Sequence, residues 1–329
     1  MMLCELIPVF LAILLLWILV SYLSWKRNLL EALTENSEVA TTSRGEIEYV
    51  LKGSGPVVLF LHGSPGGYDQ GAIDMEMWIE EGFSLLSISR PGYLRTPLST
   101  GETFEEQADA IEALLDTLEI ARVAIVGVSG GGPTALHFAL RHPDRISALV
   151  LMAAVTNEYS VNQEAMDSAL ARIFFSDSIA DFGSWLYDVI TRRWTSMSLK
   201  EAFKDTVRLE SKERDEYVKQ IMAIPEQVDW FKRFIRTVCP MTPRMIGLRN
   251  DLKLLEQVSF TSLEAINCPT LVIHGTVDGD VSFSNAEFAA SSIPGARLYT
   301  IENIGHVVWL GEHVPEMNSE LVRFLRENT

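Results

Sequence analysis

Short apolar runs that alternate with helix-like segments dominate the chain from residue 44 onward. The candidate strands, several of them almost wholly apolar, are Glu46–Leu51, Val57–His62, Phe83–Ser89, Val123–Val128, Ala148–Val155, Thr270–His274 and Arg297–Ile301. Strands that are apolar on both faces are typical of a parallel sheet with helices packed on each side. The pattern therefore predicts an α/β fold built on a mostly parallel sheet with helices on both faces.

Local signals place two of the helices between these strands. Thr103 and Glu106 have the spacing of an N-terminal capping box, and the apolar residues that follow recur every three or four positions. A second helix, Pro133–Arg141, follows a glycine cluster and ends at His142-Pro143. Both helices are expected to pack against the sheet.

The alternation stops between residues 157 and 267, where we expect several helices and no strand. This stretch falls between two strands of the sheet, so it is interpreted as an inserted helical cap on a core formed by residues 44–156 and 268–329. Its aromatic residues form either the core of the cap or an apolar substrate cavity beneath it. They are Phe174, Phe175, Phe182, Trp185, Tyr187, Trp194, Trp230, Phe231 and Phe234.

An uncharged apolar run, Leu6–Trp25, precedes the α/β region. At about 1.5 Å per residue, a helix of this length matches the ~30 Å hydrocarbon core of a bilayer. No Lys or Arg precedes the run and no small-residue cleavage site follows it, which favours a retained anchor over a cleaved signal peptide. Residues 1–27 are therefore expected to form a single-pass transmembrane helix.

The charges around this run predict its orientation. Lys26 and Arg27 follow the run directly, whereas Glu5 is the only charged side chain before it. The positive-inside tendency then places the C-terminal bulk of the chain in the cytoplasm. Residues 28–43 are polar, show no strong periodicity, and are interpreted as a linker.

The overall charge limits what the chain can bind. Lys and Arg number 27 against 44 Asp and Glu, which gives a formal net charge of −17. So acidic a chain repels phosphate backbones and argues against a nucleic-acid partner. The three cysteines show no CxxC or Cys/His ligand spacing, which argues against a zinc module or a disulfide scaffold. The sequence predicts neither a metal nor a cofactor.

The strongest chemical signal is the motif G-V-S-G-G at residues 127–131, which joins the strand Val123–Val128 to a helix. A serine at such a sharp turn is presented above the sheet, and the N–H groups at the start of the new helix point to the same place. Ser129 is therefore the candidate nucleophile.

The same glycines also fit a loose dinucleotide-binding fingerprint. That fingerprint requires an acidic residue about 20 positions further on, at the end of the next strand. The strand Ala148–Val155 ends without one, and the first acid after it is Glu158. A nucleotide site is therefore disfavoured.

A serine nucleophile of this kind needs an acid and then a histidine further along the chain. Asp278 and His306 each follow one of the last two candidate strands. The carboxyl ends of parallel strands meet at one edge of a sheet, so both side chains can reach Ser129 there. Asp280 is an alternative acid, but Asp278 is favoured because it lies nearer to the end of its strand.

An oxyanion hole needs two backbone N–H groups that point at the developing negative charge. Gly130, directly after the nucleophile, can supply one of them. The loop H-G-S-P-G-G, which follows the strand Val57–His62, can supply the other from Ser64. His62 is expected to shape this loop through hydrogen bonds.

Five motifs in order carry a family resemblance: H-G-S-P-G-G at 62–67, S-R-P-G-Y at 89–93, G-V-S-G-G at 127–131, H-G-T-V-D at 274–278, and the G-H pair at 305–306. They resemble the signatures of the α/β-hydrolase superfamily, most closely its cap-bearing esterase, haloperoxidase-like and proline iminopeptidase-like branch. The resemblance extends from about Arg44 to the C-terminus. It implies an α/β-hydrolase fold with Ser129 as nucleophile, Asp278 as acid and His306 as base. Gly130 stands where the peptidase branch usually has Trp, which weakens a peptidase assignment.

Three functional hypotheses follow. The first is a membrane-tethered serine hydrolase that cleaves a carboxylic ester or similar acyl substrate through an acyl-enzyme intermediate, with the tether favouring an apolar substrate. The second is a proline iminopeptidase-like aminopeptidase, in which acids of the cap would hold a free amine. The candidate acids are Glu158, Glu164, Asp167, Asp177, Asp181 and Asp188. The third is a non-catalytic α/β-hydrolase scaffold for ligand sensing.

Overall fold

The computed structural model describes residues 2–160, 176 and 178–329, and an eight-stranded sheet lies at its centre. The strands are β1 (Glu38–Thr42), β2 (Gly45–Lys52), β3 (Val57–Leu61), β4 (Ser84–Ile88), β5 (Val123–Val128), β6 (Ile146–Met152), β7 (Thr270–Gly275) and β8 (Arg297–Ile301). Their order across the sheet is β1-β2-β4-β3-β5-β6-β7-β8. The pairs β1–β2 and β2–β4 are antiparallel and the others are parallel. The prediction of a mostly parallel α/β sheet is confirmed.

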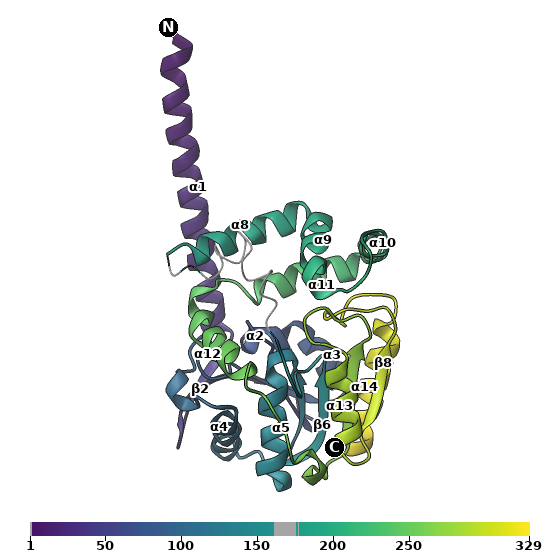
Figure 1. Cartoon of the computed structure of the whole chain (residues 1–329). Coiled ribbons are helices and arrows are strands. Elements are labelled where there is room, and N and C mark those ends of the chain that lie inside the picture. Colours follow the sequence, from purple (N-terminus) through teal and green to yellow (C-terminus); the bar gives the residue numbers. More distant parts are fainter. Residues whose placement is uncertain (1, 161–175, 177) are drawn as a thin grey trace.

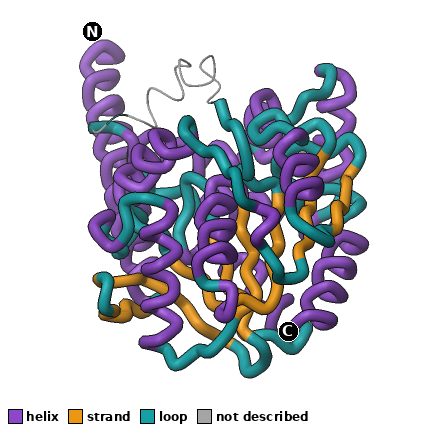
Figure 2. Tube along the Cα trace, turned by 60° about the horizontal axis from the view of Figure 1, so that its bottom comes forward, coloured by secondary structure: helices purple, strands orange, loops and turns teal. Residues whose placement is uncertain are grey.

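Helices cover both faces of this sheet, so that the strands are enclosed between them (Figure 2). One face carries α3 (Met75–Glu80) and α14 (Val314–Asn328), and the other carries α4 (Phe104–Thr117), α5 (Gly132–Arg141) and α13 (Ser284–Ser292). The side chains of β3 point alternately to these two faces. Val58 and Phe60 belong to the cluster under α14, whereas Leu59 and Leu61 belong to the cluster under α4 and α5.

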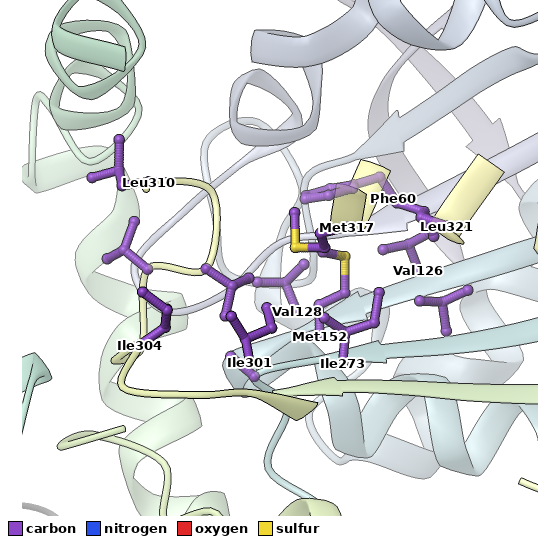
Figure 3. Close-up of a cluster of buried hydrophobic side chains, with 14 of the residues drawn as sticks. Phe60, Val126, Val128, Met152, Ile273, Ile301, Ile304, Leu310, Met317 and Leu321 are labelled. Carbon is purple, nitrogen blue, oxygen red and sulfur yellow. The ribbon is translucent and has the colours of Figure 1, made fainter. Parts of the chain in front are cut away.

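Figure 3 shows part of the first cluster, in which Phe60, Val126 and Ile273 from different strands meet Met317 and Leu321 of α14. Burial of each such side chain stabilises the fold by roughly 1.5–3 kcal/mol relative to exposure. A core packed on both faces holds the strands in one register. The strand ends that carry the candidate site are therefore held in fixed positions relative to one another.

The predicted strands are all present, and most differ at their ends by one or two residues. The largest difference is in β6, which was expected to run to Val155 but ends at Met152. The reason is local, because Ala153 has a φ of 45°, which no strand residue adopts. The predicted capping box is also confirmed, since Thr103 Oγ1 accepts a hydrogen bond from the N–H of Glu106 and the Glu106 carboxylate accepts one from that of Thr103.

Residues 28–43 do not form the expected polar linker. The N-terminal helix α1 (Met2–Glu35) continues without a break past Lys26, and residues 38–42 form the edge strand β1. Trp25 and Leu29, one helical turn apart, are both buried against the folded domain. The burial of these two side chains stabilises the part of the helix that follows the apolar run. The sequence interpretation overlooked this pair.

The first part of α1 projects away from the domain (Figure 1). From Ile7 onward it is long and apolar enough to cross a bilayer. Its apolar 18-residue window has a mean hydropathy of 2.4, and none of that window is buried. The α1 helix therefore has two parts, an exposed apolar part and a part that packs on the domain.

The described part of segment 157–267 is mainly helical. Its α-helices are α8 (Ala180–Arg193), α9 (Thr195–Thr206), α10 (Ser211–Met222), α11 (Pro225–Arg236) and α12 (Met245–Leu255). Figure 1 shows α8 to α11 grouped over one end of the sheet, with α8 next to α1. The short helix α2 (Tyr68–Gly71) follows the loop after β3.

Specific polar contacts join α1 to α8. The indole Nε1 of Trp25 donates to the buried Asp188 at 2.7 Å, and Lys26 Nζ lies 2.6 Å from the buried Asp181. The ring of Tyr22 packs edge-on against those of Phe182 and Trp185, with centroids 5.6 and 6.1 Å away. The helix that carries the apolar run is thus attached directly to the helices above the sheet.

Candidate active site

Ser129 lies at the tight turn between β5 and α5. Its φ of 48° is in the left-handed region that non-glycine residues seldom adopt. The flanking glycines allow the turn, because a Cβ on Gly127 would lie 2.7 Å from that of Ala135, and one on Gly131 would lie 2.5 Å from the Leu61 carbonyl oxygen. The strained backbone holds the Ser129 hydroxyl above the sheet, as expected for a nucleophile.

The structure brings the predicted serine, histidine and acid together. His306 Nε2 lies 3.1 Å from Ser129 Oγ, and His306 Nδ1 lies 2.8 Å from Asp278 Oδ2. Ser129 follows β5, Asp278 follows β7 and His306 follows β8. The carboxyl edge of the sheet therefore positions all three residues. Both distances fall within hydrogen-bond range, and the arrangement allows a proton to pass from the hydroxyl to the imidazole.

Backbone and histidine contacts fix the Asp278 carboxylate. Its Oδ1 accepts hydrogen bonds from the N–H groups of Asp280 and Val281 at 2.9 and 2.8 Å, and His274 Nε2 lies 3.1 Å from Oδ2. Burial acts to raise the pKa of Asp278, but His306 and His274 outweigh it and hold this pKa well below its usual range. Asp278 is therefore a fixed negative charge beside the imidazole.

Asp280, the alternative acid, contacts the other nitrogen of His306. Its Oδ2 lies 3.5 Å from His306 Nε2, and its Oδ1 accepts a hydrogen bond from Tyr159 at 2.9 Å. Burial acts to lower the pKa of His306, but the carboxylates of Asp278 and Asp280 outweigh it and raise this pKa to about 9. Two acids thus stabilise the imidazolium, and the ring must lose that proton before it can accept one from Ser129.

The loop after β3 lies directly against the nucleophile. A Cβ on Gly63 would stand 3.6 Å from Ser129 Oγ, and a Cβ on Gly130 would overlap the hydroxyl of Ser64. The N–H of Gly63 donates to Gln70 Oε1 at 2.8 Å and so is already occupied. The predicted oxyanion donors, Ser64 and Gly130, are therefore neighbours on the two segments that flank Ser129.

A buried polar network holds this loop from behind. Asp251 of α12 accepts hydrogen bonds from Arg90 at 2.5 and 3.0 Å, from the Tyr93 hydroxyl at 2.6 Å, and from the Ser64 hydroxyl. Arg90 and Asp251 are almost completely buried. Sequence reasoning found Arg90 and Tyr93 as part of a motif but missed Asp251, because its partners come from distant parts of the chain.

His62 has the role predicted for it. It is fully buried, its Nδ1 lies 2.7 Å from the Gly63 carbonyl oxygen, and its Nε2 accepts a hydrogen bond from the N–H of Arg90 at 3.0 Å. Burial lowers the pKa of His62 well below its usual value, and the charge of Arg90 acts in the same direction. A neutral His62 shapes the loop without taking part in proton transfer.

The end of α9 joins the acid loop to the histidine loop. The carbonyl oxygen of Thr206 accepts hydrogen bonds from the N–H groups of Gly279 and His306, at 3.1 and 2.9 Å. Nothing in the sequence distinguishes Thr206, since a backbone acceptor carries no side-chain signal. The geometry of the candidate site therefore depends on a residue between residues 157 and 267.

A cavity of about 240 Å³ opens beside Ser129. One wall is aromatic, because Trp230 and Phe234 of α11 stack at 5.2 Å and Trp309 stacks on Trp230 at 6.0 Å. The Trp230 Nε1 donates to Asp74 at 2.9 Å, which fixes the orientation of the indole. Across the described residues, the cavity lining includes no Lys or Arg. The cavity is thus suited to an apolar group.

The aromatic residues of segment 157–267 divide among several roles. Trp230, Phe231 and Phe234 line the cavity, whereas Trp185 packs against α1. Phe182 and Trp194 are exposed, at 39% and 54%. Phe174 and Phe175 lie outside the described residues, as do the candidate amine-binding acids Glu164, Asp167 and Asp177.

The comparison with protein families decides the classification. A family model described as alpha/beta hydrolase fold matches residues 56–312. The chain belongs to the α/β-hydrolase family. The resemblance seen in the five sequence motifs is therefore confirmed.

Among related proteins, this α/β hydrolase is 30% identical over 297 residues to the uncharacterised hydrolase YcgS of Bacillus subtilis, covering 88% of this chain and 98% of the relative. It is 27% identical to a 2-hydroxy-6-oxononadienedioate/2-hydroxy-6-oxononatrienedioate hydrolase of Cupriavidus pinatubonensis, covering 90% and 98%. Among solved structures, an alpha/beta hydrolase fold protein from Nakamurella multipartita is 31% identical with a TM-score of 0.79, covering 88% of this chain and 99% of that one. The match covers nearly the whole length of each of these three proteins.

Proposed function

We propose that this α/β hydrolase is a membrane-tethered serine hydrolase that cleaves carboxylic esters with apolar acyl groups. One observation carries the proposal. His306 lies between Ser129 Oγ, at 3.1 Å, and Asp278, at 2.8 Å, next to a cavity with an aromatic wall. Nucleophile, base and orienting acid are in hydrogen-bond reach of each other in the order that acyl transfer requires.

The proposed reaction has two halves. Ser129 Oγ attacks the ester carbonyl carbon while His306 Nε2 takes the hydroxyl proton, and the negative oxygen faces the N–H groups of Ser64 and Gly130. His306 then gives the proton to the leaving alcohol, which leaves an acyl-serine. In the second half, His306 removes a proton from water and the hydroxide attacks the acyl carbon. The bond between that carbon and Ser129 Oγ then breaks, His306 returns its proton to Oγ, and the carboxylic acid leaves.

The cavity lining favours an apolar acyl group over a dicarboxylate, the substrate class in the name of the Cupriavidus relative. A dianion needs cationic partners when it leaves water. The described lining contains no Lys or Arg, and its charged groups besides the proposed base His306 are the acids Asp74 and Asp280. The rings of Trp230, Phe234 and Trp309 provide the contact area that an acyl chain needs.

An aminopeptidase finds less support. Asp181 and Asp188, two of the acids considered for holding an amine, are buried and bind Lys26 and Trp25 of α1. The acids that do line the cavity are engaged elsewhere, Asp74 with the Trp230 indole and Asp280 with Tyr159 and His306. No described cavity acid is left unengaged to anchor an α-amino group.

A fluorophosphonate probe and a substrate panel test this function on the full-length protein in detergent. We expect the probe to label Ser129 and to leave the Ser129→Ala variant unlabelled, and p-nitrophenyl esters to be cleaved much faster than proline p-nitroanilide. Faster cleavage of the anilide would instead support the aminopeptidase. A correctly folded protein that neither reacts with the probe nor cleaves any ester would support the non-catalytic scaffold.

The tether is part of the proposal. The exposed apolar part of α1 supports a bilayer span, and Lys26 and Arg27 at its end support a cytoplasmic position for the catalytic domain. The intact N-terminus should be detected by sequencing the protein purified from membranes. Protease added outside sealed cells should leave the domain uncut, and cleavage there would reverse the proposed orientation.

A further inference from the structure

The outward face of α8 and the start of α9 is apolar where a soluble helix would be polar. Five large apolar side chains are between 39% and 54% exposed there: Ile179, Phe182, Leu186, Trp194 and Met197. The first three are spaced at i, i+3 and i+7 and so lie on one side of the helix. We call these five residues the cap patch. Scattered apolar residues are ordinary on a surface, but five large ones exposed within residues 179–197 of two consecutive helices are typical of an interaction site.

The cap patch continues the apolar surface of α1. The Phe182 ring lies edge-on against Tyr22 of α1, with the centroids 5.6 Å apart. Just before Tyr22 in the sequence, Leu19 and Val20 are 50% and 56% exposed. Figure 1 shows α8 beside the point where α1 leaves the domain. The cap patch therefore begins where the exposed part of α1 meets the domain.

Basic side chains lie at the edge of the cap patch, although the chain as a whole carries a net charge of −17. Arg192 and Arg193 end α8, and both are exposed. The Arg193 guanidinium lies 5.6 Å from the Trp194 ring centre. Trp and Arg side chains combine an apolar body with a polar end, which suits the boundary between lipid tails and headgroups.

We propose that the cap patch lies in the headgroup region of the bilayer that holds α1, so that the catalytic domain rests on the membrane through α8 and α9. This inference depends on the membrane tether of the proposed function. A lipid surface is the occupant that fits, because the contact with Tyr22 would hold Phe182 at the depth where α1 leaves the proposed bilayer. The apolar face and the basic edge match the tails and headgroups of that surface.

The contact would bring the cavity close to the lipid. Helix α8 packs against α11, and α11 supplies the aromatic wall with Trp230 and Phe234. The cavity therefore lies behind α11, the helix that packs against the membrane-facing α8. Esters dissolved in the bilayer are the substrate class that this position serves.

Fluorescence quenching in vesicles tests the proposal on the full-length protein. Cys4 is changed to Ser, since Cys239 and Cys268 are buried, and an environment-sensitive dye is attached to Leu186→Cys in phosphatidylcholine vesicles that contain nitroxide lipid. The matched control is Ile79→Cys on α3, which is 42% exposed against 44% for Leu186. Leu15→Cys on α1 reports the tether. We expect quenching at positions 186 and 15 and none at 79.

The outcomes separate the membrane contact of the cap patch from the membrane tether through α1. If the dye is quenched at position 15 but no more at position 186 than at position 79, the membrane contact of the cap patch is overturned and the tether stands. If the dye is quenched at neither position 15 nor position 186, both the cap contact and the tether are overturned. Cross-linking of two copies through position 186 without quenching would show that the cap patch joins protein molecules, and would also overturn the proposal. Equal fluorophosphonate labelling of Ser129 in all variants shows that each is folded.

A kinetic comparison gives a second readout. Leu186→Ser with Met197→Ser should lower turnover of an ester dissolved in the vesicles by roughly tenfold. Each side chain is about half exposed, so the surface that the two would bury in lipid equals about one leucine-sized side chain. Turnover of a short water-soluble ester should stay unchanged, because neither residue lines the cavity. Equal turnover of the vesicle-bound ester by this variant and by Ile79→Ser would contradict the proposal.

Discussion

At the scale of single residues, His306 is unusual in having a carboxylate near each of its ring nitrogens. Asp278 faces Nδ1 and Asp280 faces Nε2. Both favour the imidazolium, and the pKa of His306 rises to about 9 as a result. A general base works only when it is deprotonated, so kcat/KM should increase with pH until this pKa is passed.

The variant Asp280→Asn should move the midpoint of this pH profile to lower pH, by on the order of one pH unit, because one of the two nearby negative charges is removed. The measurement is kcat/KM for a p-nitrophenyl ester from pH 5 to 10, corrected for spontaneous hydrolysis. Asp205→Asn, an exposed acid at the end of α9, is the control and should keep the original midpoint. An unchanged midpoint in Asp280→Asn would contradict the role given to that carboxylate.

The Arg90–Asp251 pair permits a second prediction at this scale. Asp251→Asn leaves the Arg90 charge buried without its partner, so the free energy of unfolding should fall by about 3–5 kcal/mol. Because Ser64 loses its charged acceptor, kcat should fall more than KM rises. Chemical denaturation and ester kinetics measure the two effects. Asp116→Asn, which breaks the exposed pair with Arg145, should change stability by about 1 kcal/mol or less.

At the scale of secondary-structure elements, α11 is expected to determine which acyl groups fit the cavity. Trp230 and Phe234 form its aromatic side toward Ser129. Trp230→Ala removes one of the two indole rings of this wall and also releases Asp74 from its hydrogen bond. The cavity should therefore accept longer or bulkier acyl groups.

The expected result for Trp230→Ala is a shift of the preferred acyl chain to greater length, measured as kcat/KM over a series of p-nitrophenyl esters. Phe260→Ala is the control, because Phe260 packs on the α4–α5 side of the sheet, away from the cavity. An identical chain-length profile in Trp230→Ala and the natural protein would show that α11 does not bind the acyl group.

Sequence patterns predicted the sheet and the elbow well, because both depend on local signals. The strand β5 and the G-V-S-G-G turn lie where expected, and the ends of β7 and β8 bring Asp278 and His306 to Ser129. Contacts between segments that are far apart in the sequence leave no local pattern from which they could be predicted. Asp251 and Thr206 hold the site from helices whose packing depends on side chains far away in the sequence.

The same limit explains the missed part of α1. Its polar residues suggested a linker, and only the partners Trp185 and Cys239 reveal why Trp25 and Leu29 are buried. An apolar stripe two positions long is too short to be recognised from periodicity alone. The sequence thus predicted the elements that form the edge of the candidate site better than the elements that cover it.

At the scale of the whole molecule, the N-terminal segment is part of the domain as well as its proposed membrane anchor. A chain that starts at Val20 keeps Trp25, Leu29 and β1, whereas one that starts at Arg44 loses all three and exposes the edge of β2. The shorter chain should have a lower Tm, aggregate more and react less with fluorophosphonate. Size-exclusion chromatography and thermal unfolding in mild detergent compare the two, and equal behaviour would show that this packing is dispensable.

The unbroken α1 helix has one more consequence. With 34 residues and a rise of about 1.5 Å each, it is roughly 50 Å long and continues well past the ~30 Å hydrocarbon core. No break in the helix separates the part proposed to lie in lipid from the part bound to α8. A thicker or thinner bilayer that changes the tilt of this rod would rotate α8 with it. The lipid composition of the host membrane would then set the distance between the catalytic entrance and the water interface.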